Sequence, residues 1–282
     1  MKYGLVIQIN DVQTICDLAV EAEENGWDAV FLADALAIET KGFPAFPWYD
    51  PWIAMTAVAM KTERILISTM IIAVPRRRPW KLAREAQTLD YLSNGRLIFC
   101  AGLGAAEHDG GFYKVGEPMD LKTRAERMGE ALEIMTGLWT GKPFSFKGEH
   151  YTVDNMTMLP KPIQSPRIPV WVVGVWPREK SMRRALKYDG VIVQKYKAGP
   201  SGIPDANLIR EVRDYVFENH PQSDKFDIVA GGTTPAKSKK RAIETVRPFA
   251  EAGATWWVES DWMGDEKKLR ARIKQGPPLL EG

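Results

Sequence analysis

Cysteine and histidine are scarce in this sequence, which contains two cysteines and three histidines in 282 residues. The two thiols, Cys16 and Cys100, are far apart and do not form the disulfide framework of a small secreted protein, so we expect a reducing, cytoplasmic location. His108, His150 and His220 show none of the spacings that are typical of zinc ligands. The sequence therefore predicts no metal site.

The sequence also lacks an excess of charge and a long apolar run. Lys and Arg total 38 against 36 for Asp and Glu, which gives a net charge of +2. This balance argues against nucleic acid or an anionic membrane as the main partner. No run approaches the roughly 20 apolar residues of a membrane span, and the first residues do not read as a signal peptide. Nucleophile-elbow, P-loop and dinucleotide-binding motifs are also missing. We therefore expect a protein that acts on a small molecule, with neither nucleic acid nor membrane as a partner.

What is present is a repeated alternation of short apolar runs with longer helical patterns. Runs rich in Val, Ile, Leu and aromatic residues are typical of parallel strands that are covered on both faces. The segments between them carry apolar residues three and four positions apart and end at glycine, as helices do. The eight runs cover residues 3–9, 29–33, 65–72, 97–101, 169–173, 190–193, 226–230 and 255–258. Eight such units predict an α/β fold, a single (β/α)8 TIM barrel that forms one domain over residues 1–282.

Two stretches interrupt this alternation. Residues 39–52 are rich in aromatic side chains, which would roof a pocket for a mostly apolar or ring-bearing substrate. Residues 141–167 follow the fourth predicted helix, and we interpret them as an insertion. Within this insertion, residues 144–153 alternate around Lys147-Gly148, which predicts a β-hairpin.

Catalytic groups of a parallel barrel lie at the carboxyl ends of its strands and in the loops that follow. By this rule the candidates are Asp34, Thr69, Met70, Gly102, Gly104, Gly174, Lys195, Gly231, Gly232, Glu259 and Asp261. Lys195 follows the sixth predicted strand. A desolvated lysine at such a place acts as a nucleophile in Schiff-base lyases, so that class of enzyme stays open.

The segment from Arg77 to Gly104 reads RRPWKLAREAQTLDYLSNGRLIFCAGLG. It resembles the third helix and fourth strand of the bacterial-luciferase-like oxidoreductases, which carry Arg-x-Pro, Thr-Leu-Asp-x-Leu-Ser-x-Gly-Arg and Gly-x-Gly in this order. Further matches follow in the family's order at Glu107, Gly116, Arg124, Glu130, Leu138-Trp139, Gly141, Phe146, Gly148, Tyr151, Pro160, Pro162, Ile168–Gly174, Arg184-Ala185 and Asp189-Gly190. Because these matches cover nearly the whole chain, the sequence is identified as a member of that family.

The resemblance implies a flavin-like ring held without a covalent bond at the C-terminal face of the barrel. The ring belongs to FMN, which NAD(P)H or a partner flavin reductase reduces, or to the deazaflavin coenzyme F420. Carried over by position, the cofactor contacts are Asp34, Thr69, Met70, Gly102, Leu103, Gly104, Arg124, Gly174, Val175 and Trp176. Arg124 would face the flavin phosphate, and a non-proline cis peptide bond is often found in relatives near Thr69 and Met70. Relatives often pair through barrel helices, so a homodimer is expected.

Two positions depart from the pattern of the relatives that use F420. These relatives often have Asp-His at the end of the second strand, where this sequence has Asp34-Ala35. They also tend to have a glutamate directly after Gly-x-Gly, where this sequence has two alanines before Glu107. The missing proton-transfer groups favour FMN over F420 and leave Glu107 and His108 as nominal catalytic residues.

The sequence thus predicts a flavin-dependent oxidoreductase or monooxygenase that uses reduced FMN to oxidise or reduce a small organic substrate. The first alternative is an F420-dependent reductase or dehydrogenase. The second alternative is a non-catalytic flavin-binding protein or a Schiff-base lyase that uses Lys195. The substrate pocket is predicted from Trp48 and Trp52 in the aromatic stretch and from Arg76, whose guanidinium would hold an anionic group.

Overall fold

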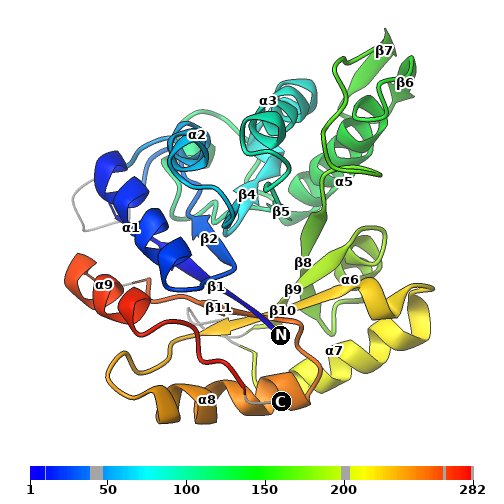
Figure 1. Ribbon diagram of the computed structural model, residues 1–282. Coiled ribbons are helices and arrows are strands. Elements are labelled where there is room, and N and C mark those ends of the chain that lie inside the picture. The colour runs from blue at the N-terminus through cyan, green and yellow to red at the C-terminus, as the bar shows by residue number, and fades with distance from the viewer. Residues whose placement is uncertain (10, 39–46, 198–203, 263–264, 281–282) are drawn as a thin grey trace.

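The computed structural model describes residues 1–282 except residues 10, 39–46, 198–203, 263–264 and 281–282. In this described part, a nine-stranded parallel sheet curls into a barrel and helices cover its outside (Figure 1). Its strands are β1 (Lys2–Ile7), β2 (Ala29–Leu32), β3 (Leu66–Thr69), β4 (Ile72–Ala73), β5 (Phe99–Gly102), β8 (Val170–Trp176), β9 (Gly190–Lys195), β10 (Asp227–Gly232) and β11 (Trp256–Glu259). Each of the eight predicted apolar runs overlaps one of these strands or, for residues 65–72, two of them.

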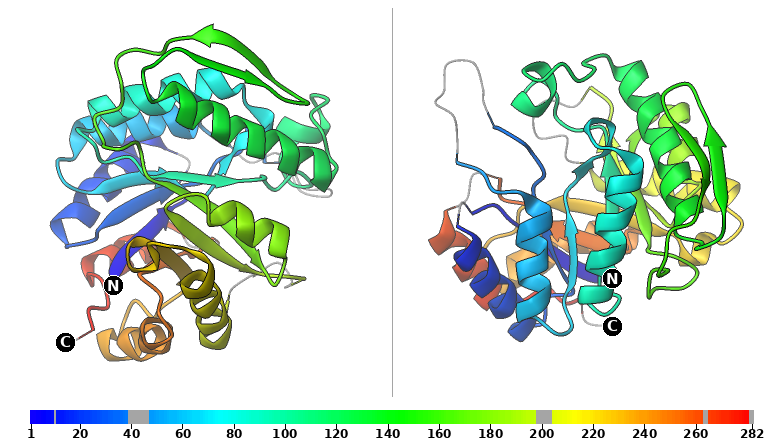
Figure 2. Two further views of the ribbon diagram at one scale, coloured as in Figure 1. Left: turned by 90° about the vertical axis from the view of Figure 1, so that its right-hand side faces the viewer. Right: turned by 90° about the horizontal axis from the view of Figure 1, so that it is seen from above.

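The helices follow the strands in sequence and form the outer layer. They are α1 (Val12–Glu24), α2 (Pro51–Lys61), α3 (Pro79–Leu92), α4 (Gly110–Tyr113), α5 (Leu121–Leu138), α6 (Glu179–Ala185), α7 (Ala206–Asn219), α8 (Lys239–Glu251) and α9 (Glu266–Lys274), with 3-10 turns η1 (Val74–Arg76) and η2 (Ser223–Lys225). The last helix, α9, packs beside the first, α1 (Figures 1 and 2). No helix in the described ranges is long and apolar enough to cross a membrane.

The sheet closes because two short strands share the third position of the barrel. β3 pairs with β2, whereas β4 pairs with β5, and Ile67 forms a parallel bridge with Leu97. The order β3-β2-β1-β11-β10-β9-β8-β5-β4 therefore returns to its starting point. This arrangement confirms the predicted TIM barrel.

The barrel interior is a packed core. Phe31, Trp171 and Trp256 point into it, and the Trp171 and Trp256 rings meet edge to face with their centroids 5.0 Å apart. Side chains next to these in each strand point outward and pack under the helices, as the two-residue period of a strand requires. Cys100 lies in this interior, where burial raises the pKa of its thiol to about 12, so the thiol stays protonated and unreactive.

An antiparallel hairpin of β6 (Phe144–Lys147) and β7 (Thr152–Met156) precedes β8, which confirms the hairpin predicted around Lys147-Gly148. It runs alongside α5 and away from the barrel (Figures 1 and 2). The Glu130 carboxylate of α5 fixes its turn by accepting backbone N–H bonds from Glu149 at 2.8 Å and Tyr151 at 3.0 Å. A carboxylate bonded to several backbone amides is a strong anchor.

At the end of the barrel where the strands begin, Arg96 is buried and uses all five of its side-chain N–H groups. Nε donates to the Ser93 carbonyl at 2.7 Å. Nη1 donates to the Thr62 hydroxyl at 2.8 Å and the Ile65 carbonyl at 3.0 Å, and Nη2 donates to the Ala59 and Thr62 carbonyls at 2.8 and 2.9 Å. Arg96 thereby joins the end of α2 to the starts of β3 and β5.

A second buried side chain at this end, Asp90 of α3, receives the segment that returns from the hairpin. Its carboxylate accepts the Ile163 N–H at 2.7 Å and the Gln164 side-chain amide at 2.7 Å. Asp90 and Arg96 both belong to the Thr-Leu-Asp-x-Leu-Ser-x-Gly-Arg motif. The motif by which the family resemblance was recognised is therefore structural, and it lies away from the face expected to carry chemistry.

Asp227 begins β10 inside the same end of the barrel. Its carboxylate accepts bonds from Trp171 Nε1 at 3.2 Å and Thr255 Oγ1 at 2.8 Å, but burial dominates and raises its pKa above the ordinary 3.8. The folded state therefore binds this proton more tightly than the unfolded state, and the free energy of unfolding falls as the pH rises from about 4 through the folded pKa. Asp227→Asn removes this ionisation, so we expect the variant to gain stability relative to the wild type as the pH rises through that window. Urea unfolding of both proteins between pH 4 and pH 7 measures this, and a constant difference across the range would contradict it.

Candidate functional site

The carboxyl ends of the strands surround an open cavity of about 420 Å³, which we call the mouth cavity. Its floor is formed by Val173, Ile192, Val229 and Val258, which continue the apolar interior of the barrel. The other lining residues are Met70, Ile71, Ala105, Val193, Gln194, Pro204, Ala230, Gly231, Ser260 and Trp262. No ionisable side chain occurs among these described lining residues. An apolar cavity of this size with a few polar groups is typical of a small-molecule site.

Met70 and Ile71, which form one wall of the mouth cavity, are joined by a non-proline cis peptide bond. This is the bond that the family resemblance implied near Thr69 and Met70. Met70 is half-buried and lines the cavity. Thr69 is fully buried on β3 and is not among the cavity residues.

Behind this wall, two carboxylates meet two guanidinium groups. Asp34 follows β2, and its side chain has no exposed area. It pairs with Arg76 and, at 2.9 Å, with Arg77. Arg76 Nε also lies 3.3 Å from the Asp109 carboxylate. We call Asp34, Arg76, Arg77 and Asp109 the ionic cluster. Arg76 was predicted to hold an anionic group of a ligand, and in the structure its guanidinium faces these two carboxylates.

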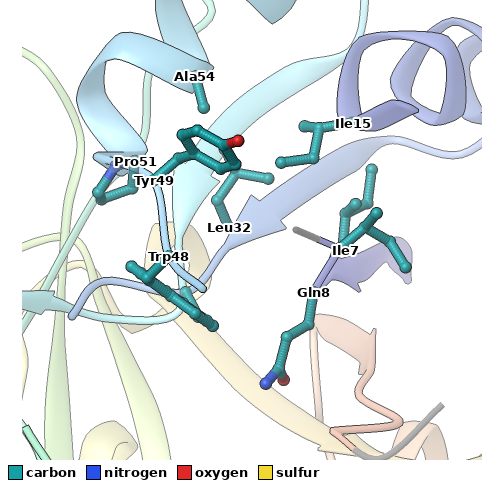
Figure 3. A pocket seen from close by; sticks show the side chains of 10 residues that line it. Ile7, Gln8, Ile15, Leu32, Trp48, Tyr49, Pro51 and Ala54 are labelled. Atoms are coloured by element: carbon teal, nitrogen blue, oxygen red, sulfur yellow. The ribbon is translucent and has the colours of Figure 1, made fainter. Parts of the chain in front are cut away.

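A small separate pocket lies at the ends of β1 and β2. Trp48 lines it together with Gln8, and both side chains extend away from Ala54 (Figure 3). Trp48, which was predicted as a substrate residue, thus lies beside the ends of β1 and β2. Trp52, which was predicted likewise, is 4% exposed, packs against Phe99 and belongs to the core under the helices. Other aromatic residues of the predicted roof, at positions 43 and 46, lie outside the described residues.

The Gly102–Gly104 segment begins at the last residue of β5 and contacts both the mouth cavity wall and Arg124. A Cβ atom at Gly102 would lie 2.3 Å from Ile71 Cδ1, so this glycine lets Ile71 pack against the β5 backbone. Arg124 of α5 donates from Nη1 to the Leu103 and Gly104 carbonyls, both at 3.1 Å. Its guanidinium also lies over the Phe112 ring, and its partial burial lowers its pKa. Arg124 therefore supports this loop directly.

Gly174 and its neighbours face the outer layer. A Cβ atom at Gly174 would lie 2.3 Å from Val191 Cγ2 and 2.8 Å from Met182 Sδ, so this glycine allows β8 and α6 to pack closely. The Val175 N–H donates to Ser181 Oγ at 3.1 Å, and the Trp176 indole donates to Glu211 at 2.6 Å. Gly102, Arg124 and Gly174 were predicted to contact one bound cofactor. In the structure Gly102 faces Ile71, Arg124 binds the carbonyls of Leu103 and Gly104, and Gly174 faces Val191 and Met182.

Comparison with known proteins identifies the family. The model of the luciferase-like monooxygenase family matches residues 3–278. The chain belongs to this family. It is 29% identical over 250 residues to an F420-dependent glucose-6-phosphate dehydrogenase of Nakamurella multipartita, which covers 86% of this chain and 68% of the relative. It is 32% identical over 170 residues to the enzyme of the same name from Gordonia bronchialis, covering 59% of this chain and 48% of the relative.

A third relative of this luciferase-like chain is named as flavin-dependent. It is the oxygenase component of a flavin-dependent trigonelline monooxygenase from Acinetobacter baylyi, 27% identical over 184 residues, covering 62% of this chain and 49% of the relative. Among solved structures, an F420-dependent secondary alcohol dehydrogenase matches with a TM-score of 0.78 and 18% identity, covering 98% of both chains. The monooxygenase RslO1 from Streptomyces bottropensis matches with a TM-score of 0.75 and 18% identity, covering 97% of both. The fold is shared, and the chain is an enzyme of the luciferase-like oxidoreductase class.

The nominal acid–base candidates of this luciferase-like enzyme lie off the mouth cavity. Glu107 and His108 are exposed on the loop before α4 and do not line the cavity. Lys195 is 48% exposed and pairs through Nζ with Asp205 at 3.1 Å. A Schiff-base lyase requires a desolvated lysine as its nucleophile, and Lys195 is exposed to solvent. No group of three or more metal-binding side chains occurs in the part of the chain that the structure describes.

Sequence reasoning missed three groups at the mouth of this luciferase-like barrel. Gln194 and Ser260 follow the inward-facing Ile192 and Val258 by two residues, so the strand period alone predicts that they point into the mouth. Applying that period beyond the apolar runs would have found both. Asp109 gave no such signal, because its partners come from distant segments of the chain.

Proposed function

We propose that this luciferase-like enzyme uses coenzyme F420 and exchanges a hydride with an uncharged organic substrate. The curated relatives support the choice of cofactor, since several of them are named as F420-dependent. This reverses the preference for FMN that the missing histidine and glutamate suggested.

The mouth cavity fits the ring of such a coenzyme. Its apolar floor suits one face of a flat tricyclic system, and Met70, Ile71 and Gly231 would hold the ring at its edges. The Gln194 amide and the Ser260 hydroxyl are the polar groups of the lining that would contact it. When bound, the coenzyme supplies the site that accepts or donates the hydride, while the protein orients it and excludes water.

The substrate class follows from the absence of charge in the described lining of the mouth cavity, and this observation carries the proposal. A phosphate brought into such a cavity loses its hydration and gains no cationic partner, which costs several kcal/mol or more. A neutral secondary alcohol or ketone has no such cost. We therefore propose that the substrate differs in charge from the sugar phosphate in the names of the curated relatives.

A proton must leave when an alcohol is oxidised to a ketone, and Ala35 and Glu107 do not serve as its acceptors. Ser260 is half-buried in the cavity lining, and its hydroxyl lies 3.4 Å from the Gly232 carbonyl. We assign it to pass the proton from the substrate oxygen to solvent. A hydroxyl can both accept and donate, so it can serve as such a relay.

An FMN-dependent monooxygenase is the second candidate. The missing proton-transfer groups at positions 35 and 105 favour it, and so does the trigonelline monooxygenase relative. In that case NAD(P)H or a separate flavin reductase would supply the electrons. The substrate would meet the same uncharged cavity lining.

Cofactor retention followed by turnover tests both candidates. The protein is incubated with F420 and, separately, with FMN, desalted, and examined by visible absorption spectroscopy. We expect F420 alone to be retained, and 2-propanol to bleach its visible band with a kcat/KM at least tenfold above that of glucose 6-phosphate. Retention of FMN alone would replace this proposal with the monooxygenase, and a preference for glucose 6-phosphate would overturn the assigned substrate class.

A further inference from the structure

The ionic cluster lies behind the wall of the mouth cavity and is almost wholly buried. The side chains of Asp34, Arg76, Arg77 and Asp109 are 0, 8, 14 and 4% exposed. Two negative and two positive groups balance one another. Charges are tolerated in such a place only when they are paired, so each member depends on the others.

Both carboxylate oxygens of Asp34 accept bonds from the protein, and the side chain has no exposed area. Oδ1 accepts from both Arg76 and Arg77, while Oδ2 accepts the backbone N–H of Ala73 at 2.9 Å. Ala73 belongs to β4, the strand that begins directly after Ile71 of the cavity wall. Asp34 therefore acts on the position of β4 and not on the cofactor itself.

Asp109 likewise binds backbone amides, in the loops after β2 and β5. Its Oδ1 accepts the backbone N–H groups of Leu36 at 3.0 Å, Ala37 at 3.1 Å and Gly111 at 2.9 Å. Asp109 also forms a β-bridge with Ile38. The loop after β2 is thereby fixed to the loop after β5, and the latter carries Ala105 of the cavity lining.

Arg76 is the member of the cluster that contacts both carboxylates in the described part of the chain. It therefore joins the loops after β2, β4 and β5 into one unit. On the basis of the proposed function, we propose that Arg76, Asp34 and Asp109 are positioning residues that hold the Ile71 and Ala105 wall of the mouth cavity in the geometry that binds the cofactor. Buried, paired side chains that act through neighbouring backbone are suited to such preorganisation.

Arg76→Lys and Asp109→Asn test this assignment. Lysine keeps the charge but lacks the planar fork that reaches two carboxylates. Asparagine keeps a carbonyl oxygen for the three backbone amides and removes only the charge that faces Arg76. The matched control is Arg167→Lys, which weakens the partly buried Arg167–Asp189 pair before β8, at the opposite end of the barrel.

Two measurements are made on each variant. Amide hydrogen exchange of the protein without cofactor reports on Leu36, Ala37 and Ala73, and fluorescence titration gives the Kd for F420. We expect Arg76→Lys and Asp109→Asn to exchange these amides at least tenfold faster and to raise the Kd at least tenfold. Arg167→Lys is expected to change both by less than twofold, whatever its melting temperature.

These outcomes distinguish a failure of the positioning role of the ionic cluster from a failure of the proposed function. Faster exchange with an unchanged Kd for F420 would make the cluster a scaffold only and overturn the assignment, and so would unchanged exchange. If the wild type binds no F420, the proposed function fails. Exchange then decides alone whether Arg76 joins the three loops.

Discussion

Arg96→Lys is expected to lower the free energy of unfolding by about 3 kcal/mol. Arg96 is 8% exposed, and its five side-chain N–H groups donate to the five acceptors described above. Lysine offers three donors from a single nitrogen, so at least two buried acceptors lose their partner. Each such loss costs roughly 1–3 kcal/mol. Burial already lowers the pKa of Arg96, which shows that its charge is held at a cost.

Denaturant unfolding of the wild type and the variant measures this difference. Arg64→Lys is the matched control, because Arg64 is exposed just before β3 and the substitution preserves its charge. We expect the control to stay within about 0.5 kcal/mol of the wild type, as surface substitutions do. A loss below 1 kcal/mol in Arg96→Lys would show that the buried hydrogen bonds are replaceable.

The second large effect is expected in Gly102→Ala, which should raise the Kd for F420 at least tenfold. The new Cβ atom would lie 2.3 Å from Ile71 Cδ1 and 2.7 Å from Ile71 Cγ1. Ile71 must then move, and it lines the mouth cavity. Adding Ile71→Ala to the same chain removes both conflicting atoms, so the double variant should bind F420 no more weakly than Ile71→Ala alone.

Gly174→Ala provides the contrast. Its Cβ atom would meet Val191 and Met182 in the outer layer, away from the mouth cavity. Overpacking of this kind costs about 1–3 kcal/mol of stability. We expect a lower melting temperature with a Kd for F420 within twofold of the wild type. Equal losses of affinity in both glycine variants would contradict the separation of the two sites.

The positions of the strands were predictable because buried parallel strands are continuous apolar runs. The break within the third predicted strand could not be predicted in this way. Residues 65–72 were predicted as one strand, and the structure divides them into β3 and β4. The apolar pattern continues through the break, so hydrophobicity alone gives no sign of it. Trp52 illustrates a related difficulty. It was grouped with the aromatic loop, but the Asp50 carboxylate caps a helix that starts at Pro51 and turns Trp52 into the core.

The candidate site was predictable in location but not in its pairing. Parallel strands place their carboxyl ends together, and this rule alone points to Asp34, Met70 and Gly102. It does not reveal that Arg76 has two carboxylate partners, because an arginine run after a strand has the same appearance whether it binds a ligand or a buried acid. Long-range ion pairs leave no periodic signal in a single sequence.

The hydrogen bonds of Asp90 and Arg96 have a practical consequence for engineering. They secure the strand beginnings, whereas the loops that shape the mouth cavity leave from the opposite ends of the same strands. Exchanging the loops that follow β8, β9, β10 and β11 would therefore leave the hydrogen bonds of Asp90 and Arg96 intact. The barrel is a suitable recipient for grafted loops that recognise other small molecules.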